Sequence, residues 1–217
     1  MNLAHAVTTE QLSDLDVVHR VVGGDTAMFE ILMRRYNQRV YRAVRAVLRT
    51  DDEVEDVMQQ AYLNAFAHLR QFADRAQFST WLIRIAVNEA LARLRKRERL
   101  AWDGDEDVMR TIESVAPDPE QQAQTSQLRA VMEEELAALP ANYRTVLVLR
   151  DVEGLSTAET ASCLEVSEEV VKTRLHRARG MVRERIASRA GATLTSVYPF
   201  GNARCDRVVE AVMARLR

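Results

Sequence analysis

A group of polar and basic side chains lies between residues 167 and 179 at the spacing of one helix face. At about 100° per residue, the other face of this helix is an apolar stripe made of Val171, Leu175, Ala178 and Val182. The polar face and its flanks carry Ser167, Glu169, Lys172, Thr173, His176, Arg177 and Arg179. These side chains hydrogen bond to phosphates and base edges, so the chemistry they favour is non-covalent contact with duplex DNA.

The residues just before this helix predict the element that positions it. Ser156 and Glu159 have the spacing of a capping box that opens a short helix over Thr157–Leu164, and a tight turn at Glu165 and Val166 follows. Together with the basic second helix, this order predicts a helix-turn-helix, although an ordinary surface helix with a basic face is an alternative. We expect phosphate contacts from Lys172, Arg177 and Arg179, and base-edge contacts from Glu169, Thr173 and His176.

The net charge of −2 conceals three blocks of opposite sign. Residues 68–100 carry eight basic and three acidic side chains, and residues 101–136 carry ten acidic and two basic ones. Residues 168–189 carry seven basic and three acidic side chains. Solvated helices alone would mix the two signs, so this segregation indicates partners of opposite charge.

Composition and periodicity predict an all-α chain of two small helical domains joined by an acidic flexible linker. Only seven glycines and four prolines interrupt the sequence, which favours helices over sheets. The second domain is expected to be the helix-turn-helix domain, followed by a C-terminal helical tail. The expected boundaries are 1–25 for a short N-terminal helix, 26–100, 101–126 for the linker, 127–190, and 191–217 for the extension.

Four helices are expected before the linker. The first lies near 14–22 and ends at Gly23 and Gly24, and the second starts at Asp25 or Thr26. A capping pair of Asp52 and Glu55 is expected to open the third, and Ser79 with Thr80 to cap a fourth that runs to about residue 99.

Several function classes are not supported by the sequence. Cys163 and Cys205 cannot form a disulfide framework, and Cys163 falls on an apolar helix position that predicts a core residue. No Gly-rich phosphate loop, zinc-type cluster or paired nucleophile and base is found, so we expect no enzyme activity, metal or cofactor. Without a signal-like start or an apolar run of membrane length, a cytoplasmic protein without membrane insertion is expected.

Two motif blocks carry a resemblance to a known family. Residues 51–66 (DDEVEDVMQQAYLNAF), Phe72 and residues 78–88 (FSTWLIRIAVN) resemble the second conserved region of sigma factors. Residues 139–150 (LPANYRTVLVLR) and 154–156 (GLS) resemble the fourth region. With no third domain between them, the chain is similar to the extracytoplasmic-function group over roughly residues 26–188. The resemblance implies an RNA polymerase specificity subunit that directs core polymerase to promoters under an external or stress signal.

The resemblance also implies roles for individual residues. In this family the helix near 52–69 docks on polymerase, and here its polar side carries Glu55, Asp56, Gln59 and Gln60, which could also be an ordinary acidic face. The following loop and helix capture the melted non-template strand at the minus-ten element. The matching residues are Phe78, Ser79, Thr80, Trp81, Arg84, Asn88, Arg93, Arg95, Lys96 and Arg97. Aromatic surfaces in a basic groove suit a single strand, although core packing explains Trp81 equally well. Ala92 departs from the acidic residue common four positions after the Asn.

The implied partners are RNA polymerase core, promoter DNA as duplex and as melted strand, and an anti-sigma factor, with a monomer when free. Two other readings remain open: a free-standing helix-turn-helix regulator, and a sigma-like protein that sequesters an anti-sigma factor. The tail carries an apolar stripe at Val208, Val209, Val212, Met213 and Leu216. It could fold back to tune activity or could only stabilise the second domain.

Overall fold

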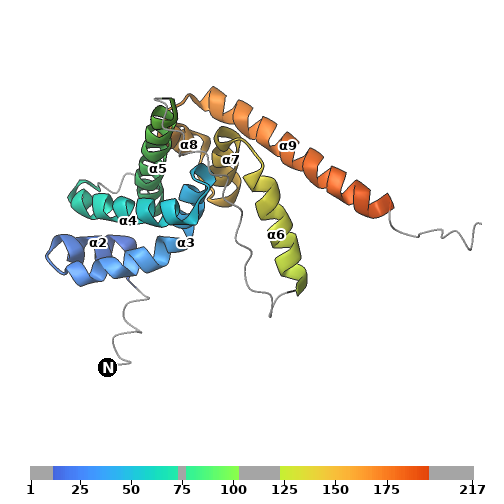
Figure 1. Cartoon of the computed structure of the whole chain (residues 1–217). Helices are drawn as coiled ribbons and strands as arrows, with labels where there is room; N and C mark the ends of the chain where they lie inside the picture. The colour runs from blue at the N-terminus through green and yellow to red at the C-terminus, as the bar shows by residue number, and fades with distance from the viewer. Residues whose placement is uncertain (1–11, 73–76, 103–122, 196–217) are drawn as a thin grey trace, which may run out of the picture.

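The structure is a computed structural model that describes residues 12–72, 77–102 and 123–195, and every regular element within them is helical. The N-terminal domain comprises α2 (Asp14–Val22), α3 (Phe29–Val47), α4 (Asp51–Ala67) and α5 (Phe78–Trp102). The C-terminal domain comprises α6 (Ala123–Ala137), α7 (Ala141–Leu147), α8 (Thr157–Leu164) and α9 (Glu168–Thr195). Helices α7 and α8 lie against α3 and α5, whereas α6 and α9 extend away from the N-terminal domain (Figure 1). The prediction of an all-α fold with two helical domains is confirmed.

Helix α2 has the bounds predicted from the sequence. A capping box opens it, because the Asp16 N–H donates to the Ser13 hydroxyl at 3.2 Å while the Ser13 N–H donates to the Asp16 carboxylate at 3.3 Å. The turn after the helix contains Gly24 at φ 111°, a left-handed conformation that glycine adopts without strain. A 3₁₀ turn, η1 (Thr26–Met28), then leads directly into α3.

The predicted cap of α4 is wrong. The helix begins at Asp51 and its N-cap is Thr50, whose backbone is extended at φ −99° and ψ 135°. The Thr50 hydroxyl donates to the Glu53 carboxylate at 2.8 Å. Acidic residues fill the first turn, where the partial positive charge of the helix end stabilises them. The acidic run therefore marks the first turn rather than the residue before it.

The predicted cap of α5 is also wrong, because the helix starts at Phe78 and not after Ser79 and Thr80. The Trp81 N–H already donates to the Gln77 carbonyl at 3.2 Å. Phe78 is only 2% exposed, so burial of its ring draws this residue into the helix. A short 3₁₀ turn, η2 (Leu69–Gln71), connects the end of α4 to the chain before α5.

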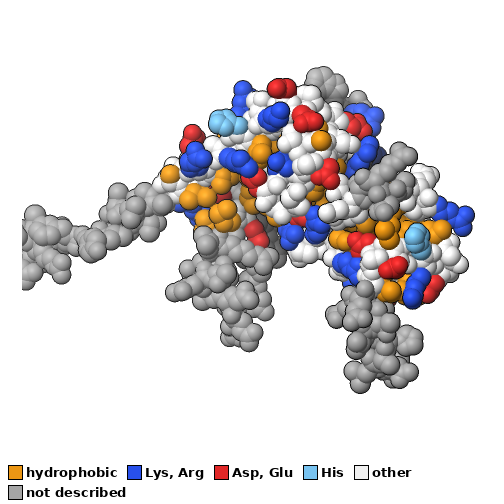
Figure 2. Space-filling view, turned by 180° about the vertical axis from the view of Figure 1, so that it is seen from behind, with side chains coloured by type: hydrophobic (Ala, Val, Ile, Leu, Met, Phe, Trp, Pro, Cys, Tyr) orange, Lys and Arg blue, Asp and Glu red, His pale blue; other side chains and the backbone are white. Residues whose placement is uncertain are grey.

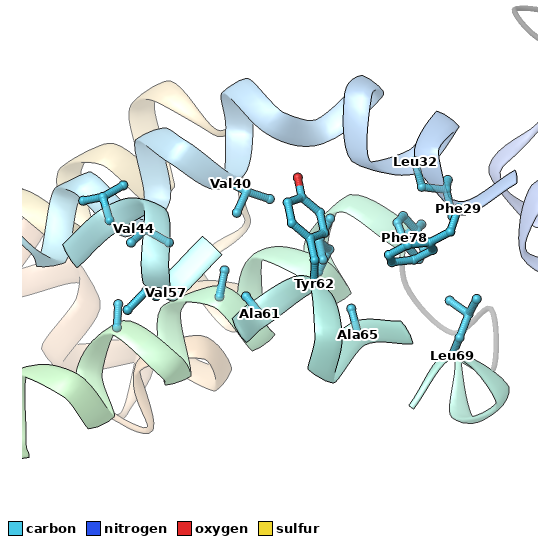
Figure 3. Close-up of a cluster of buried hydrophobic side chains, with 14 of the residues drawn as sticks. Phe29, Leu32, Val40, Val44, Val57, Ala61, Tyr62, Ala65, Leu69 and Phe78 are labelled. Carbon is cyan, nitrogen blue, oxygen red and sulfur yellow. The ribbon is translucent and has the colours of Figure 1, made fainter. Parts of the chain in front are cut away.

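The core of the N-terminal domain follows the predicted apolar faces of three helices. Figure 3 shows its side chains converging between α3, α4 and the start of α5. The fully or nearly fully buried members include Leu32, Val40, Val44, Val54, Ala61, Ala65 and Leu82. Tyr62 points from α4 toward α3, where its hydroxyl donates to the Asn37 side chain at 2.8 Å. Burial raises the pKa of Tyr62, so its hydroxyl remains a neutral donor.

The C-terminal domain has its own smaller core, formed by Leu139, Val146, Leu147, Ala161, Val171, Leu175 and Ala178. A π-helical turn, η4 (Val148–Val152), links α7 to the loop before α8. Ion pairs hold α6 to α9, because the nearly buried Glu135 accepts hydrogen bonds from Arg185 and, at 3.0 Å, from Arg189.

A third apolar cluster joins the two domains. It contains Ala43, Ile83 and Val87 from the N-terminal domain with Leu149, Leu155 and Cys163 from the C-terminal domain. The prediction that Cys163 is a core residue is confirmed, since it is 1% exposed. Burial of side chains such as Ile83 or Leu149 stabilises packing by roughly 1.5–3 kcal/mol each.

The predicted linker and tail fall largely outside the described residues. Helix α5 continues to Trp102 and α6 begins at Ala123, so regular helix occupies both ends of the range expected for the linker. Helix α9 runs without interruption to Thr195, past the expected end of the second domain. Residues 103–122 and 196–217, including Cys205 and the apolar stripe of the tail, lie outside the description.

Within the described part of the chain, no helix is both long and apolar enough to cross a membrane. The described side chains also include no group of three or more His, Cys, Asp or Glu that could hold a metal ion.

Candidate nucleic-acid interface

The helix-turn-helix is built by the capping residues that the sequence predicts. The Glu159 N–H donates to the Ser156 hydroxyl at 3.1 Å, and the Ser156 N–H donates to the Glu159 carboxylate at 2.7 Å. Glu165 makes the turn with a left-handed backbone at φ 54°. The Ser167 hydroxyl then accepts the Val170 N–H at 3.3 Å at the start of α9. The predicted capping box and the predicted cap at Ser167 are confirmed.

The predicted apolar stripe anchors α9 on the domain core. Val171 and Ala178 are 0% exposed and Leu175 is 9% exposed, with Val182 half-buried at the end of the stripe. This anchoring turns the opposite face toward solvent. The exposed face carries Ser167, Glu169, Lys172, Thr173, His176 and Arg177. In the space-filling view, lysine and arginine side chains with a histidine among them lie over the part of the surface that α9 forms (Figure 2).

Arg179 differs from the other basic residues of this face. Its guanidinium donates two hydrogen bonds to the Asp151 carboxylate, at 2.9 and 2.7 Å. This planar, two-point pair ties α9 to η4 within the C-terminal domain. Arg179 therefore sits beside the exposed face with its donors already engaged, while Lys172 and Arg177 are exposed.

The start of α5 is an aromatic cluster. The rings of Phe72, Phe78 and Trp81 lie within 5.4–5.6 Å of one another, measured between centroids. Phe78 and Ser79 are both 2% exposed, so in this conformation their side chains face the core rather than a DNA strand. Trp81 remains half-buried and keeps part of its ring at the surface.

Further along α5, the sequence-predicted strand-binding residues divide into two groups. Thr80 donates to the Glu159 carboxylate of the C-terminal domain at 3.1 Å, with the exposed Arg84 and the half-buried Asn88 following on the same side at four-residue steps. The basic group toward the end of the helix comprises Arg93, Arg95, Lys96 and Arg97. Arg97 pairs with Glu53 at 3.2 Å, whereas Arg95 and Lys96 are exposed. Ala92 is exposed beside this basic group.

The polar side of α4 is exposed as the sequence predicts. Glu55, Asp56, Gln59 and Gln60 all face solvent. Beside them lies an open pocket of about 560 Å³ between α3 and α4, which Glu55 and Gln59 border. The pocket is mostly apolar, and its lining includes Phe29, Met33, Met58, Tyr62, Leu63 and Phe66.

Two exposed apolar residues of this pocket escaped the sequence analysis. Leu63 is 64% exposed and Phe66 is 41% exposed. Both lie on α4 outside its buried stripe, and an apolar residue on the polar side of an amphipathic helix was the available signal. A patch of this kind next to polar groups is typical of a protein-binding surface.

The comparisons with known proteins match both domains. The Sigma-70 region 2 family matches residues 32–100, which spans α3 to α5. The Sigma-70 region 4 family matches residues 129–182, which contains the helix-turn-helix. The fold and its candidate interface thus define a class, the two-domain sigma factors of bacterial RNA polymerase.

Curated relatives narrow this class. The chain is 31% identical to the ECF RNA polymerase sigma-E factor of Haemophilus influenzae over 82% of its own length and 97% of the relative. It is 35% identical to the ECF sigma factor SigM of Mycobacterium tuberculosis over 77% of its length and 81% of that protein. The chain therefore belongs to the ECF RNA polymerase sigma factors.

Solved structures share the fold. The sigma factor RpoE of Bartonella quintana, solved with the anti-sigma factor NepR, aligns with a TM-score of 0.60 at 24% identity and covers 73% of this chain and 96% of that one. CnrH, solved with the cytosolic domain of CnrY, aligns with a TM-score of 0.55 at 23% identity, covering 79% and 96%.

Family membership fixes the general activity. As an ECF sigma factor, the chain directs RNA polymerase in transcription initiation, binding core polymerase and promoter DNA. Sigma factors are not enzymes, and nucleotide addition belongs to the polymerase they join.

Proposed function

We propose that the two domains divide promoter recognition between them, with α9 reading the minus-thirty-five element and α5 capturing the melted minus-ten strand. The observation that carries this proposal is the exposed polar face of α9 opposite its buried apolar stripe. A helix held this way can enter a major groove with its polar side chains toward the bases. Thr173, His176 and Glu169 then contact base edges, while Lys172 and Arg177 contact phosphates.

On α5, the exposed basic group and the partly exposed Trp81 form the strand-binding surface. Arg93, Arg95, Lys96 and Arg97 neutralise phosphates, and Arg84 extends this line toward the start of the helix. Asn88 has an amide that can donate to and accept from a base edge. Phe78 and Ser79 act from within, because their burial fixes the position of Trp81 and Thr80.

Polymerase docks on α4 in this proposal. The exposed side chains of Glu55, Asp56, Gln59 and Gln60 suit a partner helix with basic residues. The neighbouring pocket offers the apolar contact area that charged groups alone do not supply, and Leu63 and Phe66 stand at its rim.

An anti-sigma factor is a further proposed partner. Its support is the likeness of the fold to two sigma factors that were solved with such proteins, RpoE with NepR and CnrH with the cytosolic domain of CnrY. The tail beyond residue 195 is a second proposed site of regulation, and its removal from the full chain addresses that role separately.

Run-off transcription with reconstituted core polymerase on a promoter library tests the function. The purified chain is expected to bind core polymerase and to select a defined set of promoters. Lys172→Ala is expected to weaken promoter binding by about five- to tenfold across sequences and to lower the salt slope by about one, because one phosphate contact is lost.

Arg34→Ala serves as the matched control, since it removes one positive charge from an exposed position on α3. It is expected to leave promoter binding unchanged. A chain that shows no affinity for core polymerase contradicts the proposal, as does promoter footprinting that is identical with and without polymerase. The first result favours a free-standing regulator or a sigma-like sequestering protein.

A further inference from the structure

We propose that the free chain rests in a closed state, in which the C-terminal domain covers part of the strand-binding surface of α5 and must swing away before strand capture. The proposal rests on the proposed role of α5. Its observation is the packing of α7 and α8 against α3 and α5, where residues far apart in the sequence meet. The partner for this face of the N-terminal domain is thus the chain's own second domain.

A buried carboxylate forms the ionic part of the interface. The side chain of Glu153 is 0% exposed, and its oxygens accept from Arg39 at 2.8 Å and from Arg42 at 2.5 Å. Arg39 also donates to the Glu153 backbone carbonyl at 2.8 Å. Both arginines lie on α3, so the charge of Glu153 is compensated by the other domain. A buried charge that loses its partners is strongly unfavourable, which makes these contacts selective for the closed arrangement.

The end of α3 supplies a second set of contacts. Arg144 is 4% exposed and donates to the carbonyls of Ala46 at 2.7 Å and Val47 at 3.3 Å. The Thr145 hydroxyl lies 3.0 Å from the same Ala46 carbonyl. These carbonyls belong to the last turn of α3, where a helix carries partial negative charge and needs donors. The C-terminal domain therefore caps a helix of the N-terminal domain.

The covered face includes residues assigned to strand capture. Ile83 and Val87 are buried in the apolar cluster between the domains, and Thr80 is bound to Glu159. Arg84 lies near enough to Cys163 to act on its thiol electrostatically. The first half of α5 is thus closed, whereas the polar face of α9 stays exposed. The closed chain is expected to contact duplex DNA while a single strand finds only the basic end of α5.

Promoter geometry requires the domains to separate. Elements centred near minus ten and minus thirty-five lie about 25 base pairs apart, which is roughly 85 Å at 3.4 Å per base pair. A compact chain of this length has a radius of gyration of only about 17 Å. One closed molecule cannot place α5 and α9 on both elements, so opening must accompany assembly on the promoter.

The thiol of Cys163 provides a native reporter of opening. It faces the interface at 1% exposure, and its alkylation by N-ethylmaleimide can be followed by peptide mapping that counts Cys205 separately. The test variant is Arg39→Gln with Arg42→Gln, which strips Glu153 of both charge partners. Glu153→Gln provides a second variant from the other side of the interface. The control is Arg20→Gln with Arg34→Gln, which removes the same charge from exposed positions of the same domain.

We expect Cys163 to react slowly in the wild-type and control chains and more than about tenfold faster in both interface variants, with helical content by circular dichroism unchanged. Binding of a fluorescein-labelled single strand of mixed sequence is expected to tighten at least about threefold in the arginine variant, although two positive charges are gone. Rapid alkylation of the wild-type chain overturns the closed resting state. Faster alkylation without a gain in strand binding over the control overturns the covering role. Loss of run-off transcription in the wild-type chain sinks the proposed function instead, and the alkylation rates do not depend on it.

Discussion

At the scale of single residues, Arg144 serves both domains at once. Besides its bonds to α3, its guanidinium donates to the carbonyls of Leu139 at 3.1 Å and Ala137 at 3.3 Å, so one side chain serves the ends of two helices. Burial lowers the pKa of Arg144 to about 10, which still leaves it charged near neutral pH. Its acceptors are carbonyls rather than carboxylates, so helix ends stabilise this charge.

Replacing Arg144 is therefore expected to be costly. Arg144→Met leaves buried carbonyls without donors, which costs about 3 kcal/mol of unfolding free energy. Urea denaturation followed by circular dichroism measures this loss. Arg144→Lys is expected to recover only part of it, because an ammonium group cannot reach acceptors spread around a planar guanidinium. Arg34→Met, at an exposed site, is expected to stay within about 0.5 kcal/mol of wild type. Equal stability of Arg144→Met and wild type contradicts this role.

At the scale of elements, the capping signals were only partly readable in the sequence. Ser13, Ser156 and Ser167 each cap the helix that follows them. The caps of α4 and α5 were misplaced because several polar residues compete at each site. Thr50 won over Asp52 through its extended backbone, and burial of Phe78 decided the start of α5.

The contact between α6 and α9 is a pH-dependent one. Hydrogen bonds from Arg185 and then Arg189 hold the pKa of Glu135 below its ordinary value of 4.5. Because the folded state binds the proton less readily than the unfolded state, this pairing stabilises the fold above the ordinary pKa. The stabilisation is lost as the pH falls through the lowered pKa.

Thermal melting across a pH series tests this contribution. The wild-type chain is expected to melt at a higher temperature than Glu135→Gln at neutral pH, with the difference closing as the pH drops below 4.5. Glu30→Gln, which breaks an exposed pair with Arg34, is the control and is expected to show a much smaller difference at any pH. A Glu135→Gln difference that persists in acid would indicate a packing effect instead.

At the scale of the whole molecule, the interface couples two domains that each have their own core. The intact chain is expected to unfold in one calorimetric transition, with equal calorimetric and van't Hoff enthalpies. Arg39→Gln with Arg42→Gln is expected to split this transition into two, because each domain then melts independently. The exposed Arg20→Gln with Arg34→Gln pair should retain the single transition. Two transitions in the wild-type chain would show that the domains are not coupled.

The domain interface marks the limit of what the sequence could predict. Apolar periodicity identified the faces of α3, α4 and α9, since each face is defined by residues within a few turns. The pairing of Arg42 with Glu153 joins residues 111 positions apart, and no local pattern distinguishes these side chains from solvated ones. Ile83 likewise gave no sign that its neighbours come from another domain. The family regions were evident from motifs, but their mutual packing was not.

The uneven exposure of the two DNA-binding surfaces has a consequence for the order of events in the cell. Replication forks and transcripts always present unpaired bases, and a subunit with an open strand-binding groove would be diverted onto them. With the start of α5 closed and α9 exposed, intact double helix is the first nucleic acid this molecule can examine. Under the proposed closure, melted promoter DNA becomes accessible to it only after it has found its place on the enzyme.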